Sequence, residues 1–227
     1  MNTTHRGVVV RQILPLNRLQ KNMAKAMKTS LDTLALCQVS RELDLSALQP
    51  FETFGLNSLL MVSVAQTLTT HPLLTAELTA DGMVQFDSIN LGMAIALPQG
   101  LVVAVLHGAD QMNIKQMDTA CRDLADRARS NRLTLADIEG GTFTVSNLGS
   151  LGIDSGIAIP RPPESAILLF GAAKPRALVV DGELAIRTTC IATLSYDHRF
   201  IDGAGAAAFL NDLYVFLLNP EFLLETP

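Results

Sequence analysis

The run TLSYDHRFIDGAGAAAFL, residues 193–210, joins the end of an apolar stretch to a segment rich in small residues. The apolar stretch, Leu184–Leu194, has the composition of a buried strand, and Ala204–Leu218 has that of a helix. The loop between them carries His198 and Asp202, four residues apart and followed by a glycine. A histidine and a carboxylate in such a loop predict acid–base chemistry, although spacing alone more often marks a structural or solvated histidine.

The composition of the 227-residue chain predicts one well-packed globular domain. Hydrophobic residues make up 48% of it and charged residues 17%, which leaves ample apolar surface for a core. The mean hydropathy of +0.30 is high for a soluble monomer and indicates apolar surface buried between subunits. A net charge of −5 does not favour nucleic acid as a partner, because nucleic-acid-binding proteins carry basic patches.

The cysteines and the longest apolar run indicate the compartment that the chain suits and whether it enters a membrane. The three cysteines are widely spaced, which supports neither a disulfide framework nor a zinc site, so we expect no metal and a reducing compartment. The longest apolar stretch, Leu91–Val105, is interrupted by Pro98-Gln99-Gly100. This pattern predicts a strand–turn–strand hairpin instead of a membrane segment. The polar first residues indicate no signal peptide.

Periodicity and turn residues predict alternating helices and strands. Asn113 and Gln116 form a capping-box pattern at the start of one helix, and the Asp-Gly pairs at 81–82 and 181–182 predict hairpin turns. We therefore expect a mixed or largely antiparallel sheet packed by helices. Helices are predicted over 16–30, 54–70, 114–130 and 204–218, and extended segments over 7–14, 34–42, 74–79, 83–86, 89–97, 101–106, 142–145, 166–172, 177–180 and 184–194.

Three motifs together resemble a known family. The runs Gly140–Gly149 (GGTFTVSNLG), Pro162–Leu168 (PPESAIL) and Leu194–Gly203 follow one another in the order and spacing of the catalytic domain of the dihydrolipoamide acyltransferases. These enzymes are the core components of the 2-oxoacid dehydrogenase complexes. The resemblance extends over nearly the whole chain, from residue 16 to residue 224.

The resemblance implies a chloramphenicol-acetyltransferase-like α/β fold and a homotrimer with active sites between subunits, often assembled into a core of 24 or 60 chains. It implies that residues 1–227 form one catalytic domain with residues 1–14 as an N-terminal arm. It implies coenzyme A and acyl-dihydrolipoamide as substrates and the dehydrogenase components as partners. Because the chain contains no recognisable lipoyl or subunit-binding domain, we expect the lipoyl group on another domain or protein. The expected location is the cytoplasm, or the mitochondrial matrix in a eukaryote.

The family's catalytic positions match three residues. A thiol with a pKa of about 8.5 is mostly protonated at neutral pH, so its attack on a thioester needs a base. His198 matches that base, which contributes roughly 10²–10⁴ in rate. Ser146 matches a hydroxyl that stabilises the oxyanion by about 3 kcal/mol, although a serine here is more often a strand-end hydroxyl. Asp202 is expected to order the loop and the imidazole, to cap the following helix, or both. Ser146 and His198 are expected to meet from different chains.

Several points stay open. The Ser-Asn-Leu-Gly run resembles pyruvate-type members and so favours acetyl as the acyl group. Two other readings are a free-standing trimeric acetyltransferase that acts on a small acceptor and a non-catalytic core scaffold. The basic residues of the first helix are expected on a solvated face, with coenzyme A phosphates as the alternative. Asp197 and Arg199 are expected to form an ion pair, and the apolar tail at 222–224 is expected to dock on a neighbouring chain.

Overall fold

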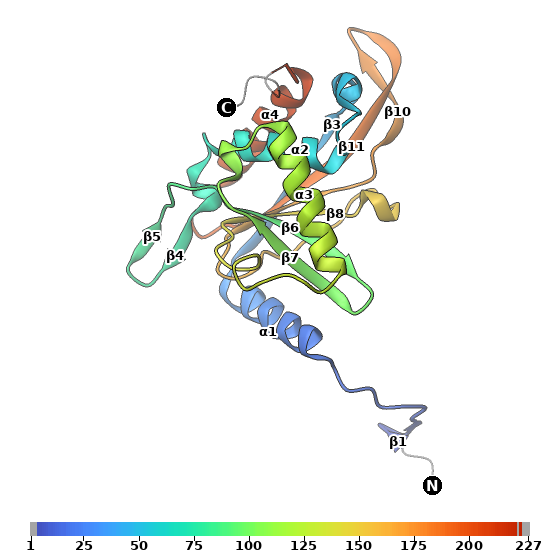
Figure 1. Ribbon diagram of the computed structural model, residues 1–227, viewed down its shortest axis with the longest axis vertical. Helices are drawn as coiled ribbons and strands as arrows, with labels where there is room; N and C mark the ends of the chain where they lie inside the picture. Colours follow the sequence, from blue (N-terminus) through green and yellow to red (C-terminus); the bar gives the residue numbers. More distant parts are fainter. Residues whose placement is uncertain (1–3, 222, 224–227) are drawn as a thin grey trace.

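The computed structural model describes residues 4–221 and 223, and its centre is a seven-stranded mixed sheet (Figure 1). Strands β6 and β7 form an antiparallel hairpin, whereas β6, β8 and β9 run parallel to one another. Strand β11 pairs antiparallel with β10 along its first half and with both β3 and β9 along its second half. The bounds are β3 (Leu36–Asp44), β6 (Leu91–Leu97), β7 (Gly100–Leu106), β8 (Phe143–Asn147), β9 (Ala166–Phe170), β10 (Lys174–Val180) and β11 (Glu183–Asp197).

Three helices cover one face of this sheet: α2 (Leu56–Leu68), α3 (Ile114–Arg129) and α4 (Gly203–Leu218) (Figure 1). The first helix, α1 (Arg18–Thr33), lies toward the other face, near β7. Side chains alternate along a strand, so β8 sends Phe143 toward the three helices, where its ring packs 6.0 Å from that of Phe209. The next residue along β8, Thr144, therefore faces the α1 side.

Short elements connect these layers. Strands β4 (Glu77–Thr79) and β5 (Gly82–Val84) form a separate hairpin, as do β1 (Thr4–His5) and β2 (Val8–Val9) near the N-terminus. The 3₁₀ turns are η1 (Ser46–Phe51), η2 (Pro72–Thr75), η3 (Ala109–Gln111) and η4 (Gly149–Leu151). No helix among residues 4–221 is long and apolar enough to span a membrane.

Most predicted elements are confirmed with shifts of a few residues at their ends. The extended segment predicted at 7–14 contains only the two-residue strand β2, and the one predicted at 74–79 begins in η2 and becomes a strand only at Glu77. The capping box at Asn113 and Gln116 is present, and the turn between β10 and β11 has positive φ at Asp181 (51°) and Gly182 (86°), as its Asp-Gly pair requires. The predicted mixed, largely antiparallel sheet is also confirmed. The predicted docking tail at 222–224 lies outside the described residues except for Leu223, which is buried in the chain's own core.

The apolar stripe of α1 is only partly covered by its own chain. Met23 and Leu31 on α1 are 42% and 52% exposed, and Leu16 just before the helix is 52% exposed, whereas the stripe of α3 is buried throughout. Residues 4–14 and the β10–β11 hairpin also extend from the body of the molecule (Figure 1). Val179 and Leu184 on this hairpin are 72% and 83% exposed. Burial of these apolar side chains therefore requires a surface that a single chain does not supply.

Candidate active site

The loop that carries His198 is held rigidly by the residue before it. The fully buried carboxylate of Asp197 accepts hydrogen bonds from the Arg199 guanidinium, at 2.6–3.0 Å, and from the backbone N–H of Ala35. The backbone N–H groups of Asp197 and His198 donate to Ser165 and Ala35 respectively. The predicted ion pair is thus confirmed, and the other hydrogen bonds attach the loop to the residues just before β3 and β9.

Charge–charge contact keeps this anchor ionised. Burial by itself would raise the pKa of Asp197, but the hydrogen bonds from Arg199 and from the backbone lower it on balance. Arg199 responds in the opposite sense, because its hydrogen bond to Asp197 raises the pKa of the guanidinium. The loop therefore keeps a paired, charged anchor at neutral pH.

The His198 side chain lies exposed beyond the end of β11. Its ring lies 5.6 Å from that of Tyr196, measured between centroids, and makes no hydrogen bond to any residue in the described part of the chain. Asp202 accepts a hydrogen bond from the backbone N–H of Gly205 at 2.7 Å and so caps α4. The capping role predicted for Asp202 is confirmed, whereas its carboxylate makes no hydrogen bond to the imidazole.

Ser146 faces a cavity on the α1 side of the sheet. Strand alternation points Ser146 the same way as Thr144, and both line a cavity of about 450 Å³. Its walls come from α1, β6–β9 and the segment 157–161, and most of them are apolar. Within the described chain the Ser146 hydroxyl makes no hydrogen bond, so it is not used to terminate the strand. It remains available as a donor to a group in the cavity.

Ser146 and His198 are too far apart to act together within one chain. Across the sheet, Tyr196 pairs with Ala166, and Thr144 pairs with Ile167, which places His198 level with residue 141 of the β8 segment. Ser146 lies five positions further along, about 16 Å in the strand direction, and two strand spacings add about 10 Å across the sheet. A site that uses both groups therefore needs His198 from another chain.

Sequence reasoning assigned no role to a buried charged pair beside this cavity, of which only Arg161 lines it. Glu164 has a fully buried side chain that accepts a hydrogen bond from the Thr144 hydroxyl and lies 3.3 Å from the Arg161 guanidinium. Burial raises the pKa of Glu164, and the contacts with Thr144 and Arg161 offset only part of this effect. A glutamate next to two prolines at the start of an apolar strand was the available signal.

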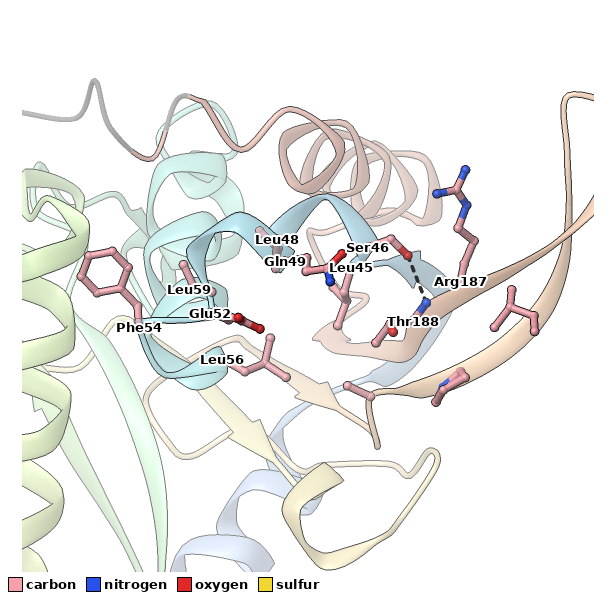
Figure 2. A pocket seen from close by; sticks show the side chains of 13 residues that line it. Leu45, Ser46, Leu48, Gln49, Glu52, Phe54, Leu56, Leu59, Arg187 and Thr188 are labelled. Carbon is pink, nitrogen blue, oxygen red and sulfur yellow. Dashed lines mark hydrogen bonds between the residues drawn. The ribbon is translucent and has the colours of Figure 1, made fainter.

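A second hollow, of about 530 Å³, lies between η1 and the base of the β10–β11 hairpin (Figure 2). Leucine side chains from η1 and α2 form one wall, and the Thr188 backbone N–H donates to Ser46 Oγ at 3.0 Å on the other. Neither Ser146 nor His198 lines it. It is therefore separate from the predicted chemistry.

The basic residues of α1 lie on a solvated face, as predicted. Lys28 pairs with Asp32, and the Gln20 side chain accepts from the Asn17 backbone to complete a capping box. Gln20 thus stabilises the helix start. Residues 4–221 and 223 contain no cluster of three or more histidine, cysteine, aspartate or glutamate residues that could hold a metal ion.

Comparison with known proteins places this geometry among acyltransferases. Residues 10–225 match the family model of the 2-oxoacid dehydrogenases acyltransferase catalytic domain. The chain is 34% identical over 226 residues to the dihydrolipoyllysine-residue succinyltransferase component of the Rickettsia felis 2-oxoglutarate dehydrogenase complex, covering 94% of this chain and 56% of that protein. It is 32% identical to the acetyltransferase component of the Rickettsia bellii pyruvate dehydrogenase complex, covering 94% and 54%. The chain thus spans about half the length of these relatives.

Solved structures agree with the fold. The Azotobacter vinelandii dihydrolipoamide acetyltransferase has a TM-score of 0.90 and 27% identity, with 95% of both chains covered. In that protein a serine, a histidine and an asparagine were studied for their roles in catalysis; the histidine follows the serine by 52 positions, and the asparagine follows the histidine by four. The solved cubic core of a pyruvate dehydrogenase multienzyme complex has a TM-score of 0.91 and 27% identity, with 96% of both chains covered. A chloramphenicol acetyltransferase gives 0.59 at 17% identity, covering 91% of this chain and 99% of that one, which confirms the predicted fold class.

Proposed function

The chain belongs to the acyltransferase catalytic-domain family of the 2-oxoacid dehydrogenases, and we propose that it transfers an acyl group between S-acyldihydrolipoamide and coenzyme A. One observation carries the assignment of residues. His198 follows Ser146 by 52 positions and Asp202 follows His198 by four, the same separations as the serine, histidine and asparagine of the Azotobacter enzyme. Asp202 thus stands where that protein has asparagine.

In the proposed reaction, His198 removes the proton from the coenzyme A thiol as its sulfur attacks the thioester carbon. A carbon–sulfur bond forms, and the negative charge moves to the carbonyl oxygen, which accepts a hydrogen bond from the Ser146 hydroxyl. Collapse of this intermediate breaks the bond to the lipoyl sulfur. That sulfur takes the proton back from His198, and the products are acyl-coenzyme A and dihydrolipoamide.

The proposed contribution of Asp202 is to hold the loop that carries His198 in place. Its cap on α4 fixes the loop end four residues after the base, and the ion pair of buried Asp197 with exposed Arg199 fixes the other end. An imidazole held on such a loop loses little conformational freedom when substrate binds. The proposed role of Asp202 is therefore to orient the loop that presents His198.

The proposed active unit is a homotrimer in which each site takes Ser146 from one chain and His198 from its neighbour. The separation of the two groups within a chain and the exposed apolar stripe of α1 support this arrangement. The solved cubic core has nearly the same fold, so larger cores of 24 or 60 chains, partner dehydrogenase components and a lipoyl group on another domain or protein belong to the same proposal.

The test is transfer from acetyl- or succinyl-coenzyme A to free dihydrolipoamide by the purified chain. Wild type should transfer, His198→Ala should lose roughly 10²–10⁴-fold, and Arg132→Gln, an exposed control, should match wild type. Equal rates for wild type and His198→Ala would support the scaffold alternative. Faster transfer to chloramphenicol than to dihydrolipoamide would support the free-standing acetyltransferase. Acetyl, predicted from the Ser-Asn-Leu-Gly run, and succinyl are both offered because relatives of both kinds match.

A further inference from the structure

The proposed reaction leaves unused the ring of Tyr196, which lies beside the His198 imidazole. The two ring centroids are 5.6 Å apart, and the ring planes are tilted by 44°. Aromatic rings attract one another at centroid distances of about 4.5–7 Å in such tilted arrangements. Because the imidazole is exposed and makes no hydrogen bond to the described part of the chain, this contact is available to select one of its side-chain rotamers.

Tyr196 is held firmly by the sheet. Its side chain is 1% exposed, and its backbone pairs with Cys37 on β3 and with Ala166 on β9. Buried residues on strands that are paired on both sides open least often. Tyr196 therefore offers the exposed imidazole a ring whose own position is fixed.

The hydroxyl of Tyr196 reaches β3 and the first turn of α4. It makes a hydrogen bond with the Cys37 side chain, and its oxygen lies 3.8 Å from the position that a Cβ on Gly203 would occupy. Burial, with smaller effects from Cys37 and Asp202, raises the pKa of Tyr196 to about 12. The hydroxyl thus stays protonated at neutral pH and ties the ring to two neighbouring elements.

The orientation of the imidazole sets how often the base is ready to take a proton. A histidine side chain has a small set of staggered rotamers, and a given ring nitrogen points at the thiol in only one of them. An aromatic pair at this spacing favours the paired rotamer by about 3- to 10-fold. Without the ring, the productive fraction falls by that factor, and kcat falls with it because substrate binds whichever rotamer is present.

We propose that Tyr196 is a positioning residue whose ring holds the His198 imidazole in the rotamer that receives the thiol proton. The inference rests on the proposed function, since it takes His198 as the base. The aromatic ring carries this role, and the hydroxyl serves to fix the ring. The contact is made within one chain, so it does not depend on how the chains assemble.

The test compares Tyr196→Phe, which keeps the ring, with Tyr196→Leu, which removes it, in acyl transfer from acetyl- or succinyl-coenzyme A to dihydrolipoamide. Tyr196→Leu should lower kcat about 3- to 10-fold with KM unchanged, and Tyr196→Phe should keep nearly the wild-type kcat. Tyr214→Leu is the matched control. It removes the chain's other tyrosine ring, which lies on α4 with the Arg41 guanidinium 4.2 Å from its centroid, and should keep the wild-type kcat.

Nuclear magnetic resonance separates positioning from a general loss of structure. In wild type, the ring protons of Tyr196 and His198 should show a nuclear Overhauser effect, with His198→Ala used to assign the imidazole signals. The His198 ring signals should shift in Tyr196→Leu, because the ring current of the tyrosine is gone, and should shift little in Tyr196→Phe. Circular dichroism and native mass spectrometry check that the variants keep the wild-type fold and oligomer.

Three results overturn the inference while the proposed function stands. The first is a folded, active wild type without the Overhauser effect, which decides the matter even where Tyr196→Leu does not fold. The second is a folded Tyr196→Leu with the wild-type kcat. The third is a loss of kcat that Tyr196→Phe shares in full, because the ring would then not be the working group. Absence of acyl transfer by wild type overturns the proposed function and the inference together.

Discussion

Two inactive variants of this protein should restore activity when they share an oligomer. Ser146→Ala removes the oxyanion donor and should cost about 10²–10³ in rate, and His198→Ala removes the base at a cost of about 10²–10⁴. Within one chain the sheet register separates these groups by about 16 Å along the strands and about 10 Å across them. A complete site therefore takes one group from each of two chains.

The size of the recovery follows from the geometry of a ring. In trimers formed at random from equal amounts of the two variants, about one interface in four pairs an intact Ser146 with an intact His198. The mixture should thus regain about a quarter of the wild-type rate, far above either variant alone. The assay is coenzyme A-dependent acyl transfer after co-refolding, with native mass spectrometry to measure how many oligomers are mixed.

The control pairs the double variant Ser146→Ala/His198→Ala with Ser146→Ala. No interface in that mixture contains an intact serine, so its rate should stay at the level of the single variant. If the Ser146→Ala and His198→Ala chains form mixed oligomers but the rate does not rise, the interfacial site is refuted, because a site contained in one chain cannot be rebuilt by mixing.

Three further results are expected. Asp202→Ala removes the cap of α4 and should lower the free energy of unfolding in urea by about 1 kcal/mol, whereas Asp202→Asn should stay close to wild type. The Thr134 backbone N–H and the Arg127 guanidinium lower the pKa of Asp137 to about 2. The contribution of this carboxylate to the stability of the folded chain is therefore complete above about pH 4 and is lost as the pH falls toward 2. Asp137→Asn should accordingly have a lower Tm than wild type at pH 7, and this difference in Tm should shrink as the pH falls toward 3. A difference in Tm that stays constant with pH would contradict this reasoning. Gly149→Ala places a Cβ 2.5 Å from the Gly171 carbonyl oxygen and should destabilise by about 1–3 kcal/mol in the same urea assay, where an unchanged midpoint would show that the loop can yield.

Local signals in the sequence were sufficient for the helices and most strand ends. The buried stripe of α3 (Ile114, Met117, Cys121, Leu124 and Ala128) follows from apolar residues at a helical period, and its capping box from two side chains three positions apart. The Asp-Gly turn between β10 and β11 depends on positive φ at the adjacent residues Asp181 and Gly182. The turn predicted at 81–82 lies one residue earlier, at Ala80 and Asp81, because Thr79 pairs with Gly82. All these features are decided by interactions within a few residues, so the sequence alone determined them.

The candidate site likewise has features that the sequence predicted and features that it did not. His198 and Asp202 lie in one loop, and the capping role of Asp202 was predicted from its place before a helix. Sequence motifs picked out Ser146 by resemblance, but they did not show that its hydroxyl faces a cavity. Nor did they indicate the contact that brings Arg161 and Glu164 to Thr144.

The pairing of parallel strands β8 and β9 decided those points. Thr144 and Glu164 are twenty positions apart, and their contact depends on the register in which Thr144 pairs with Ile167. A shift of one residue would turn Thr144 and Ser146 to the opposite face of the sheet. Register is fixed by packing between distant segments, so only the tertiary structure could bring Arg161 into the wall of the cavity that Ser146 faces and separate Ser146 from His198.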